Sequence, residues 1–267
     1  MADRSTHYKL YYHPTSSASM RVTLYLRCRP VPADLVELVQ TGLASDHRGI
    51  PQYSIPEGDA AALGLASTAL TAFNPEGRVP VLLLPDGRRM TQTGPIIEFI
   101  EANLPVDVGG ASLMPDDPWL RAEAARIMWI IAADTQPYQN IPFIIQAIGE
   151  WGMVKSDPTK HPLRLHFIRR EFGAIEKLLA KCSGRFAVGD SVTVADCFLV
   201  PQIRNALLAE IDLEAEFPLL AKVWRNMLAV PEVKQVLDEA GGVVQNFVFD
   251  EEKFTVYAHD ADGRTEP

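Results

Sequence analysis

Cysteine is scarce in this sequence. The 267 residues contain three cysteines, Cys28, Cys182 and Cys197, which lie far apart and are odd in number. A disulfide framework needs an even set of cysteines, so we expect buried thiols in a reducing compartment instead. The first residues, Met1 to Arg4, also lack the apolar core of a signal peptide. We therefore expect a cytoplasmic protein.

Long apolar runs and an excess of basic charge are also missing. The longest apolar stretches, such as residues 127–133, are far shorter than the roughly 20 residues that span a bilayer. The net charge is −9, whereas a nucleic-acid-binding protein needs a basic stripe to contact phosphates. We expect neither a membrane nor a nucleic acid as a partner, and we interpret Arg169-Arg170-Glu171 as a solvated helix face.

Several catalytic motifs are absent as well. The sequence contains no Gly-x-Gly-x-x-Gly motif, no Gly-Lys-Ser/Thr phosphate loop and no Gly-x-Ser-x-Gly elbow. Its six histidines form no His-x-x-x-His pair, and there is no Cys-x-x-Cys. The sequence thus offers no support for a simple hydrolase or dehydrogenase, and we predict no metal site.

The first hundred residues carry a mixed α/β pattern. Alternating and apolar stretches predict strands at 9–13, 34–39, 81–84 and 89–91, and helical spacing predicts helices at 19–28 and 92–103. The segment 41–64 is rich in Gly, Ser, Ala and Pro with weak periodicity, which predicts an inserted, mobile loop.

Beyond a Pro- and Gly-containing linker at 104–116, the pattern is almost wholly helical. Asp117-Pro118 is typical of a helix start, and Pro137 predicts a break or kink. Thr193 to Asp196 predicts an N-terminal capping box, opening a helix that bends or stops near Pro201. Further helices are expected at 163–179, 217–229 and 232–239. We expect an α/β domain at 1–104 with an insertion at about 41–66, an all-helical domain at 117–240 and a C-terminal extension at 241–267, which docks through its aromatic residues.

Three segments of the α/β part suggest an anion-binding site. Ser16-Ser17-Ala18-Ser19 opens a helix after a strand, where free backbone N–H groups and the helix dipole attract negative charge. A cis bond in Val79-Pro80 exposes the Val79 backbone for pairing with an extended peptide. Gln92-Thr93 begins a second helix, where a carboxylate can bind. Each segment alone is also compatible with ordinary capping or an edge strand, but the ordered set suits a small anionic peptide with a thiol.

In this order, the motifs resemble those of the zeta class of the glutathione transferase superfamily, the class that includes maleylacetoacetate isomerase. The resemblance covers about residues 8–237, outside the insertion. Five segments carry it. Residues 16–21 resemble the signature Ser-Ser-Cys-Ser-Trp-Arg, residues 74–80 resemble the cis-proline segment, and Gln92-Thr93 stands where the family has Gln-Ser or Glu-Ser. Residues 136–140 resemble Gln-Pro-Leu-Gln-Asn, and residues 188–202 resemble the class pattern.

This resemblance implies a thioredoxin-like domain that binds glutathione, a helical-bundle domain that completes the substrate pocket, and a homodimer. It implies that Ser17 hydrogen-bonds the glutathione sulfur and, with the helix dipole, lowers the pKa of the thiol, with Ser16 assisting. The implied glutathione-binding residues are Ser16, Ser17, Val79, Pro80, Gln92, Thr93, Gln136 and Asn140. The implied substrate pocket consists of Ala18, Met20, Arg21, Tyr138, Phe143, Arg204 and Leu208.

The sequence departs from the class at the substrate side. Ala18 replaces the signature cysteine, and Met20 replaces the tryptophan with a more adaptable side chain. Leu208 stands where the isomerases carry an arginine for the substrate carboxylate; Arg204, one turn earlier, starts about 6 Å away along the helix. Losing that anchor favours a less polar enone over a dicarboxylic one.

Three functions fit these residues. The first is a glutathione-dependent cis–trans isomerase of an activated alkene, with glutathione as a regenerated cofactor. The second is a glutathione transferase that conjugates electrophiles, and the third is a non-catalytic glutathione-transferase-like binding module. We expect the first. The hydroxyl, cis-proline and helix combination argues against the third, whereas Ala18, Thr93, the insertion and the tail are the features that favour it.

Overall fold

The computed structural model describes residues 7–46, 50–104, 110–153 and 157–241, together with the backbone of 247–250 and 255–258. The chain divides into two compact units, of which one comprises Met1–Ser45 and Pro51–Ser112 and the other Asp46–Ile50 and Leu113–Pro267. Cys28, Cys182 and Cys197 are all free thiols, as the sequence predicted, but of the three only Cys197 is buried, and Cys28 and Cys182 are half-buried.

The N-terminal unit is built on a four-stranded mixed sheet. Its order is β2-β1-β5-β6, with bounds β1 Tyr8–Tyr12, β2 Val36–Gln40, β5 Val81–Leu83 and β6 Arg89–Thr91. β1 runs parallel to β2 and antiparallel to β5, which in turn is antiparallel to β6. Leu10, Tyr11, Val81 and Leu82 are fully buried, so the two central strands carry the core. All four predicted strands are present within two residues of their expected bounds.

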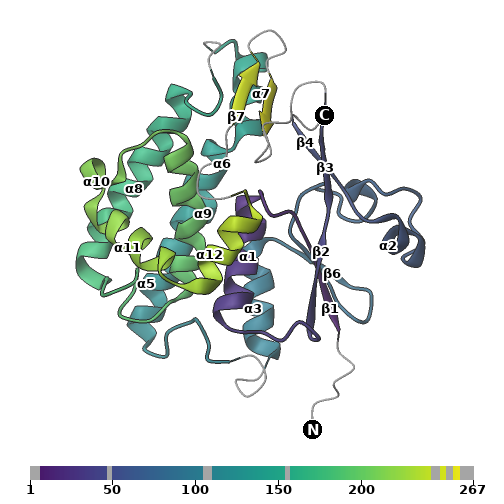
Figure 1. The fold of residues 1–267 in the computed structure, drawn as a ribbon, viewed down its shortest axis with the longest axis horizontal. Coiled ribbons are helices and arrows are strands. Elements are labelled where there is room, and N and C mark those ends of the chain that lie inside the picture. The colour runs from purple at the N-terminus through teal and green to yellow at the C-terminus, as the bar shows by residue number, and fades with distance from the viewer. Residues whose placement is uncertain are drawn as a thin grey trace. The chain divides into compact units, whose positions relative to one another are not determined.

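Two helices, α1 (Ser17–Cys28) and α3 (Thr93–Asn103), pack against each other on one side of this sheet (Figure 1). α1 begins two residues before the predicted start because the Ser16 side chain caps it by accepting a hydrogen bond from the Ser19 backbone N–H. Arg29, at its other end, donates to the Tyr25 hydroxyl and the Leu104 carbonyl oxygen, and this ties the end of α1 to the end of α3.

The segment that was expected to be a loop contains regular structure. Strands β3 (Gly42–Ser45) and β4 (Pro51–Ser54) form an antiparallel hairpin, and the helix α2 (Glu57–Ala62) follows it. Gly42 lies close to the opposite strand, since a Cβ at this position would lie 2.5 Å from the Ser54 hydroxyl oxygen, which would have to rotate away. A short 3-10 turn, η1 (Leu70–Ala72), then leads toward β5. The sequence concealed these elements because the strands are only four residues long and rich in small side chains.

The second unit is helical. Its elements are α5 (Pro118–Trp129), the π-helical segment η2 (Ile130–Thr135), α6 (Gln136–Gln139), α7 (Ile141–Trp151), α8 (Pro162–Cys182), α9 (Val194–Leu208), α10 (Leu213–Glu216), α11 (Pro218–Leu228) and α12 (Pro231–Glu239). The predicted start at Asp117 is confirmed, because its carboxylate accepts hydrogen bonds from Trp119 N and Leu120 N. The predicted break near Pro137 is present. The π-helical segment η2 ends at Thr135, just before Pro137, and Asn140, three residues after it, has an extended backbone that ends α6.

α9 is the buried centre of this unit and packs against α5 and α11. The predicted capping box is present, since the Asp196 carboxylate accepts hydrogen bonds from Thr193 N and from Ala187 N. The helix was expected to bend or stop near Pro201. It does not stop there, because α9 continues for seven residues beyond Pro201. Proline inside a helix costs about 3 kcal/mol, but burial of the surrounding apolar side chains on all faces outweighs that cost.

In the C-terminal extension, β7 (Phe247–Asp250) and β8 (Thr255–Ala258) pair in antiparallel fashion. The side chains of this extension, on which the expected docking depends, lie outside the described residues.

The capping box provides a stability test. Asp196→Ala leaves two buried backbone N–H groups without their acceptor, at about 1–3 kcal/mol each, so the free energy of unfolding should fall by at least about 2 kcal/mol. All four tryptophans lie in the helical unit, so urea unfolding followed by tryptophan fluorescence measures the change there.

The matched control is Asp212→Ala, which removes the exposed N-cap of α10 and should cost about 1 kcal/mol. Equal effects of the two substitutions would contradict the structural role given to Asp196.

Candidate active site

Strand register brings three of the predicted segments to one end of the sheet. Tyr11 of β1 lies opposite Val81 of β5, and Val81 lies opposite Thr91 of β6. The chain leaves β1 toward Ser16, enters β5 from Val79-Pro80, and leaves β6 at Gln92. Because β5 is antiparallel to both neighbours, these three connections emerge at the same end of the sheet. The site is therefore assembled by backbone pairing.

Ser16 and Ser17 occupy the start of α1. Ser16 is the N-cap, and its Oγ accepts from Ser19 N at 3.3 Å, while Ser17 is the first helical residue. Both side chains are half-buried, as is that of Ala18. The helix has no acidic residue in its first turn that would compete with a bound anion. This corner can hold a negatively charged atom between hydroxyls and backbone N–H groups.

His13 lies between β1 and α1 and is uncharged at neutral pH. Burial lowers the pKa of its imidazole to about 4. Its Nδ1 accepts a hydrogen bond from Thr15 N and lies 2.8 Å from the Thr15 hydroxyl oxygen, so the ring proton is on Nε2. Negative charge at this corner is therefore stabilised by dipoles and not by a histidine cation.

The Val79–Pro80 bond is cis, as the sequence analysis expected, and both residues are buried. Asn74 holds the loop that precedes them. Its side-chain amide donates to the Arg78 carbonyl oxygen at 2.8 Å, and its side-chain oxygen accepts from Glu76 N at 3.2 Å. The Asn74 side chain thus bonds to two backbone groups of the loop that leads into β5 and fixes the shape of that loop.

Gln92 and Thr93 form the start of α3, as predicted. Gln92 has φ = 70°, a left-handed conformation that is uncommon for residues other than glycine and concentrates at functional sites. Its side-chain amide donates to Glu76 Oε2 at 3.0 Å, which links the loop before β5 to the end of β6. Thr93 is buried, whereas Gln92 is exposed and accessible to a ligand.

Four of the predicted site residues lie around α6 and α7 in the helical unit. Gln136 begins α6 and Asn140 caps α7 one turn later, where its carbonyl oxygen accepts from Phe143 N at 3.0 Å. The Tyr138 ring stacks on Phe167 at 4.4 Å between centroids and meets the edge of Phe143 at 5.7 Å. These aromatic rings form an apolar surface beside two amide side chains.

Arg204 and Leu208 lie on the last two turns of α9. Arg204 is buried, its Nη2 donates to the Ala240 carbonyl oxygen at 3.0 Å, and burial lowers its pKa to about 10. The guanidinium thus contacts the end of α12. Leu208, the last residue of α9, is half-buried.

Met20 and Arg21 are more deeply buried than pocket residues usually are. Met20 is 1% exposed and Arg21 is fully buried, and burial lowers the pKa of the guanidinium to about 9. Among the candidate residues of α1, the accessible side chains are those of Ser16, Ser17 and Ala18.

Two residues of this corner were missed from the sequence. The Ser19 hydroxyl accepts from His13 N at 3.3 Å, and so joins the end of β1 to the first turn of α1. Tyr53 of β4 reaches the same corner from the insertion, with its ring centroid 5.9 Å from that of His13. Nothing local in the sequence marks Tyr53, because its contact is with a residue 40 positions away.

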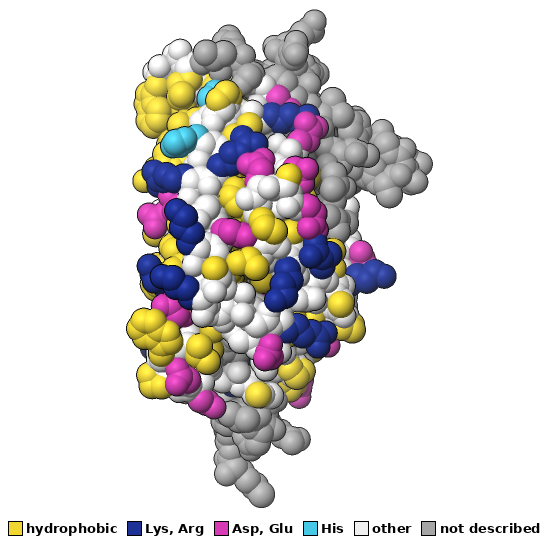
Figure 2. Space-filling model, turned by 90° about the vertical axis from the view of Figure 1, so that its left-hand side faces the viewer, with side chains coloured by type: hydrophobic (Ala, Val, Ile, Leu, Met, Phe, Trp, Pro, Cys, Tyr) yellow, Lys and Arg dark blue, Asp and Glu magenta, His cyan; other side chains and the backbone are white. Residues whose placement is uncertain are grey.

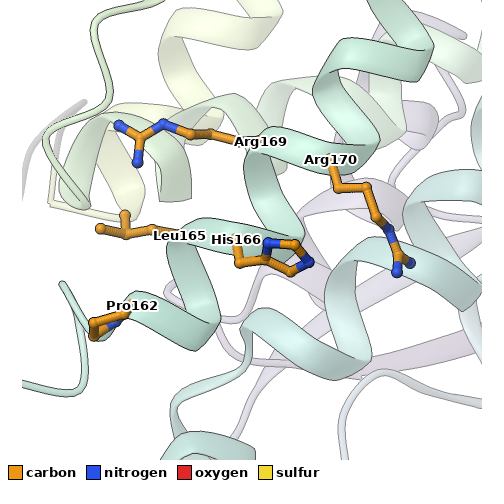
Figure 3. Close-up of a pocket in the computed structure, with 5 residues that line it drawn as sticks. All are labelled: Pro162, Leu165, His166, Arg169 and Arg170. Carbon is orange, nitrogen blue, oxygen red and sulfur yellow. The ribbon is translucent and has the colours of Figure 1, made fainter.

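A separate shallow hollow on α8 is not part of this corner. It is lined by Pro162, Leu165, His166, Arg169 and Arg170 (Figure 3). Arg169 makes two hydrogen bonds to Glu216 and Arg170 one to Glu171, so both cations are neutralised. Figure 2 shows Lys and Arg interspersed with Asp and Glu over one face of the molecule. Arg169 and Arg170 are exposed, as the interpretation of a solvated face predicted, but Glu171 is buried at 8% exposure.

Neither metal ligation nor membrane insertion is found in the part of the chain that the structure describes. There, no three His, Cys, Asp or Glu side chains are grouped as metal ligands. None of the helices described has the length and apolar character needed to cross a bilayer.

Two family profiles match this chain. The glutathione S-transferase N-terminal domain matches residues 15–103, and the glutathione S-transferase C-terminal domain matches residues 148–240. Maleylacetoacetate isomerase of Mus musculus is 30% identical over 227 residues, which cover 85% of this chain and 90% of the mouse protein. Maleylacetoacetate isomerase of Rhizobium meliloti (strain 1021) is 31% identical over 227 residues, with 83% and 91% covered.

Solved structures show the same similarity. Maleylacetoacetate isomerase from Anaeromyxobacter dehalogenans 2CP-1, with bound GSH in the active site, matches with a TM-score of 0.65 and 27% identity, over 87% of this chain and 95% of that one. Maleyl pyruvate isomerase, a bacterial glutathione S-transferase in zeta class, matches with a TM-score of 0.66 and 25% identity, over 85% and 95%.

The neutrality of His13 gives a pH prediction. The folded pKa of about 4 lies below the ordinary 6.5, so the unfolded chain takes up a proton that the folded chain does not. Between pH 6.5 and 4, this lowers the free energy of unfolding as the pH falls. His13→Asn should flatten that dependence in urea unfolding at pH 7 and pH 5.

His7 is the control with the opposite sign. Its hydrogen bond to Glu37 raises its pKa, so its stabilisation is present below pH 6.5 and is lost as the pH rises through the raised value. His7→Gln should therefore steepen the fall toward low pH. An identical pH dependence in wild type and His13→Asn would show that His13 is not buried neutral.

Proposed function

Because this chain belongs to the zeta class of the glutathione S-transferase superfamily, we propose that it is a glutathione-dependent cis–trans isomerase of an activated alkene. One observation carries the proposal. Sheet register places the hydroxyls at the start of α1 beside the backbone before β5 and the start of α3. The relatives' names favour an isomerase over a conjugating transferase or a non-catalytic module.

The residues present fit glutathione. The tripeptide has a thiol, an extended backbone and carboxylates. The half-buried hydroxyls of Ser16 and Ser17 suit the sulfur, the Val79 backbone suits the peptide, and the first turn of α3 at Gln92 and Thr93 suits a carboxylate. With Pro80 shaping the Val79 loop and Gln136 and Asn140 adding amide contacts from the helical unit, these are the proposed binding residues.

When bound, glutathione supplies a thiolate that adds reversibly to the alkene, so that the former double bond can rotate before the thiol is released. Ser17 donates a hydrogen bond from its hydroxyl to the sulfur, and Ser16 assists from the N-cap position. The N-terminal dipole of α1 adds a further positive potential. Since His13 is neutral, these groups lower the thiol pKa without a nearby imidazolium.

The helical unit contributes the alkene-binding surface in this proposal. Tyr138 and Phe143 supply an apolar wall, and α1 contributes Ala18, whereas Met20 and Arg21 are buried beneath it. Arg204 is engaged with Ala240, and Leu208 replaces the carboxylate-binding arginine expected for the class. A cis-enone that depends little on a second carboxylate therefore suits this chain better than a dicarboxylic one.

Membership of this class also suggests a domain organisation, an oligomeric state and a compartment, which we propose for this protein. Residues 1–104 are the glutathione-binding domain, 117–240 the substrate domain and 241–267 an extension. The protein is proposed to be a cytoplasmic homodimer. Light scattering on the purified protein tests the dimer, since a monomer at micromolar concentration would contradict it.

The activity has a direct test. The purified protein is incubated with a trace of glutathione and excess maleylacetone, and both double-bond geometry and glutathione are followed by NMR. We expect many turnovers of isomerisation with no loss of glutathione. Stoichiometric consumption would instead indicate a conjugating transferase, and absence of both reaction and glutathione binding would indicate a non-catalytic protein.

Ser17→Ala tests the assigned donor. Loss of one preorganised donor should lower kcat by about 100-fold or more, while glutathione still binds through its other contacts. Ser67→Ala, which removes an exposed hydroxyl from the same unit, is the control and should keep full activity. Full activity of Ser17→Ala would show that the sulfur contact was assigned wrongly.

A further inference from the structure

The proposed glutathione site contains a carboxylate that no local sequence pattern marks. Glu76 lies in the loop before β5, and its Oε2 accepts a hydrogen bond from the Gln92 side-chain amide at 3.0 Å. Both side chains are exposed, so a ligand can reach them. Glu76 thus brings a negative charge to the start of α3 from a segment 16 residues earlier in the chain.

The loop holds Glu76 in place through its backbone. The Glu76 N–H donates to the side-chain oxygen of Asn74 at 3.2 Å, and the N–H of the next residue, Gly77, donates to the Asn74 carbonyl oxygen at 2.8 Å. Asn74 is buried, and Gly77 has φ = 63°, a left-handed conformation that favours glycine. The turn is therefore well defined, and the Glu76 side chain starts from a fixed position.

The charge of this carboxylate is not neutralised by the protein. In the part of the chain that the structure describes, Glu76 forms no ion pair, and its hydrogen-bond partner Gln92 is uncharged. An ionised carboxylate has about four lone-pair sites, of which the Gln92 amide uses one. Glu76 can therefore accept further hydrogen bonds from a cationic group of a ligand.

Glutathione has such a group at one of its two ends. Its γ-glutamyl end carries a carboxylate and an ammonium on the same carbon atom, whereas its glycine end carries a carboxylate alone. When the first turn of α3 at Gln92 and Thr93 holds the glutamyl carboxylate, the ammonium lies beside that turn. A neighbouring carboxylate then attracts the glutamyl end and repels the glycine end.

We propose that Glu76 is a specificity-determining residue of the glutathione site, binding the ammonium of the γ-glutamyl group while the first turn of α3 binds its carboxylate. This rests on the proposed function. The Gln92 amide, which donates to Glu76, keeps the acceptor beside the start of the helix. The two residues together select an amino-acid zwitterion at this end of the site.

The test compares the binding of two peptides to the full-length protein by calorimetry. One is glutathione, and the other is N-glutaryl-cysteinylglycine, which is glutathione without the ammonium group. We expect wild type to bind glutathione about three- to tenfold more tightly, between the values for an exposed ion pair and for a hydrogen bond to a charged group. Glu76→Gln, which keeps the size and removes the charge, should weaken glutathione alone and bring the two affinities within about twofold.

Asp86→Asn is the matched control. It removes an exposed carboxylate from the turn at the other end of β5 and β6, and it should bind both peptides as wild type does. Added salt should also narrow the wild-type preference for glutathione, because an exposed ion pair is screened. A preference that is independent of salt would contradict a contact between charges.

The two proposals fail in different ways. Equal weakening of both peptides by Glu76→Gln would show that this carboxylate only holds the loop, and it would overturn the role of Glu76 alone. A wild type that binds both peptides equally would do the same. A wild type that binds neither peptide would overturn the proposed function as well.

Discussion

The site depends on the antiparallel pairing of β5 with β1 on one side and β6 on the other. Leu10 and Tyr11 of β1, like Val81 and Leu82 of β5, point to opposite faces of the sheet and are fully buried, so a slip of one residue in either ladder would place each side chain in packing fitted to a different one. The apolar energy of that core therefore sets the register. The register in turn sets where Ser16, Val79 and Gln92 lie relative to one another, although none of the three belongs to a strand of the sheet.

The chemistry of the corner follows from what burial does to charge. An imidazolium beside the sulfur would be costly in this half-buried place, and the pKa of His13 falls accordingly. What remains are groups that need no net charge: hydroxyls, backbone N–H groups and a helix dipole. Such groups are already oriented before a ligand arrives, because Ser16, Ser19 and His13 hydrogen-bond locally.

The helical unit uses its buried polar groups differently. Asp196 binds backbone N–H groups, Arg204 binds a carbonyl oxygen at the end of α12, and Arg164 binds the Gln139 carbonyl oxygen. Arg204 and Arg164 join segments that are distant in sequence, and Arg164 holds α6, on which Gln136 and Tyr138 lie. The buried polar side chains near the proposed substrate surface therefore bind backbone groups and hold the helices in place.

Local patterns in the sequence determined much of this protein: the strands of the sheet, the hydroxyl-rich start of α1, the start of α3 at Gln92-Thr93 and the capping box at Thr193. Each depends on interactions within a few residues, which short patterns encode. Only the tertiary structure decided that α9 passes through Pro201, that residues 42–54 form a hairpin, and that the Tyr53 ring lies beside His13. These outcomes depend on burial and on contacts between residues far apart in the chain, whose energies no local pattern carries.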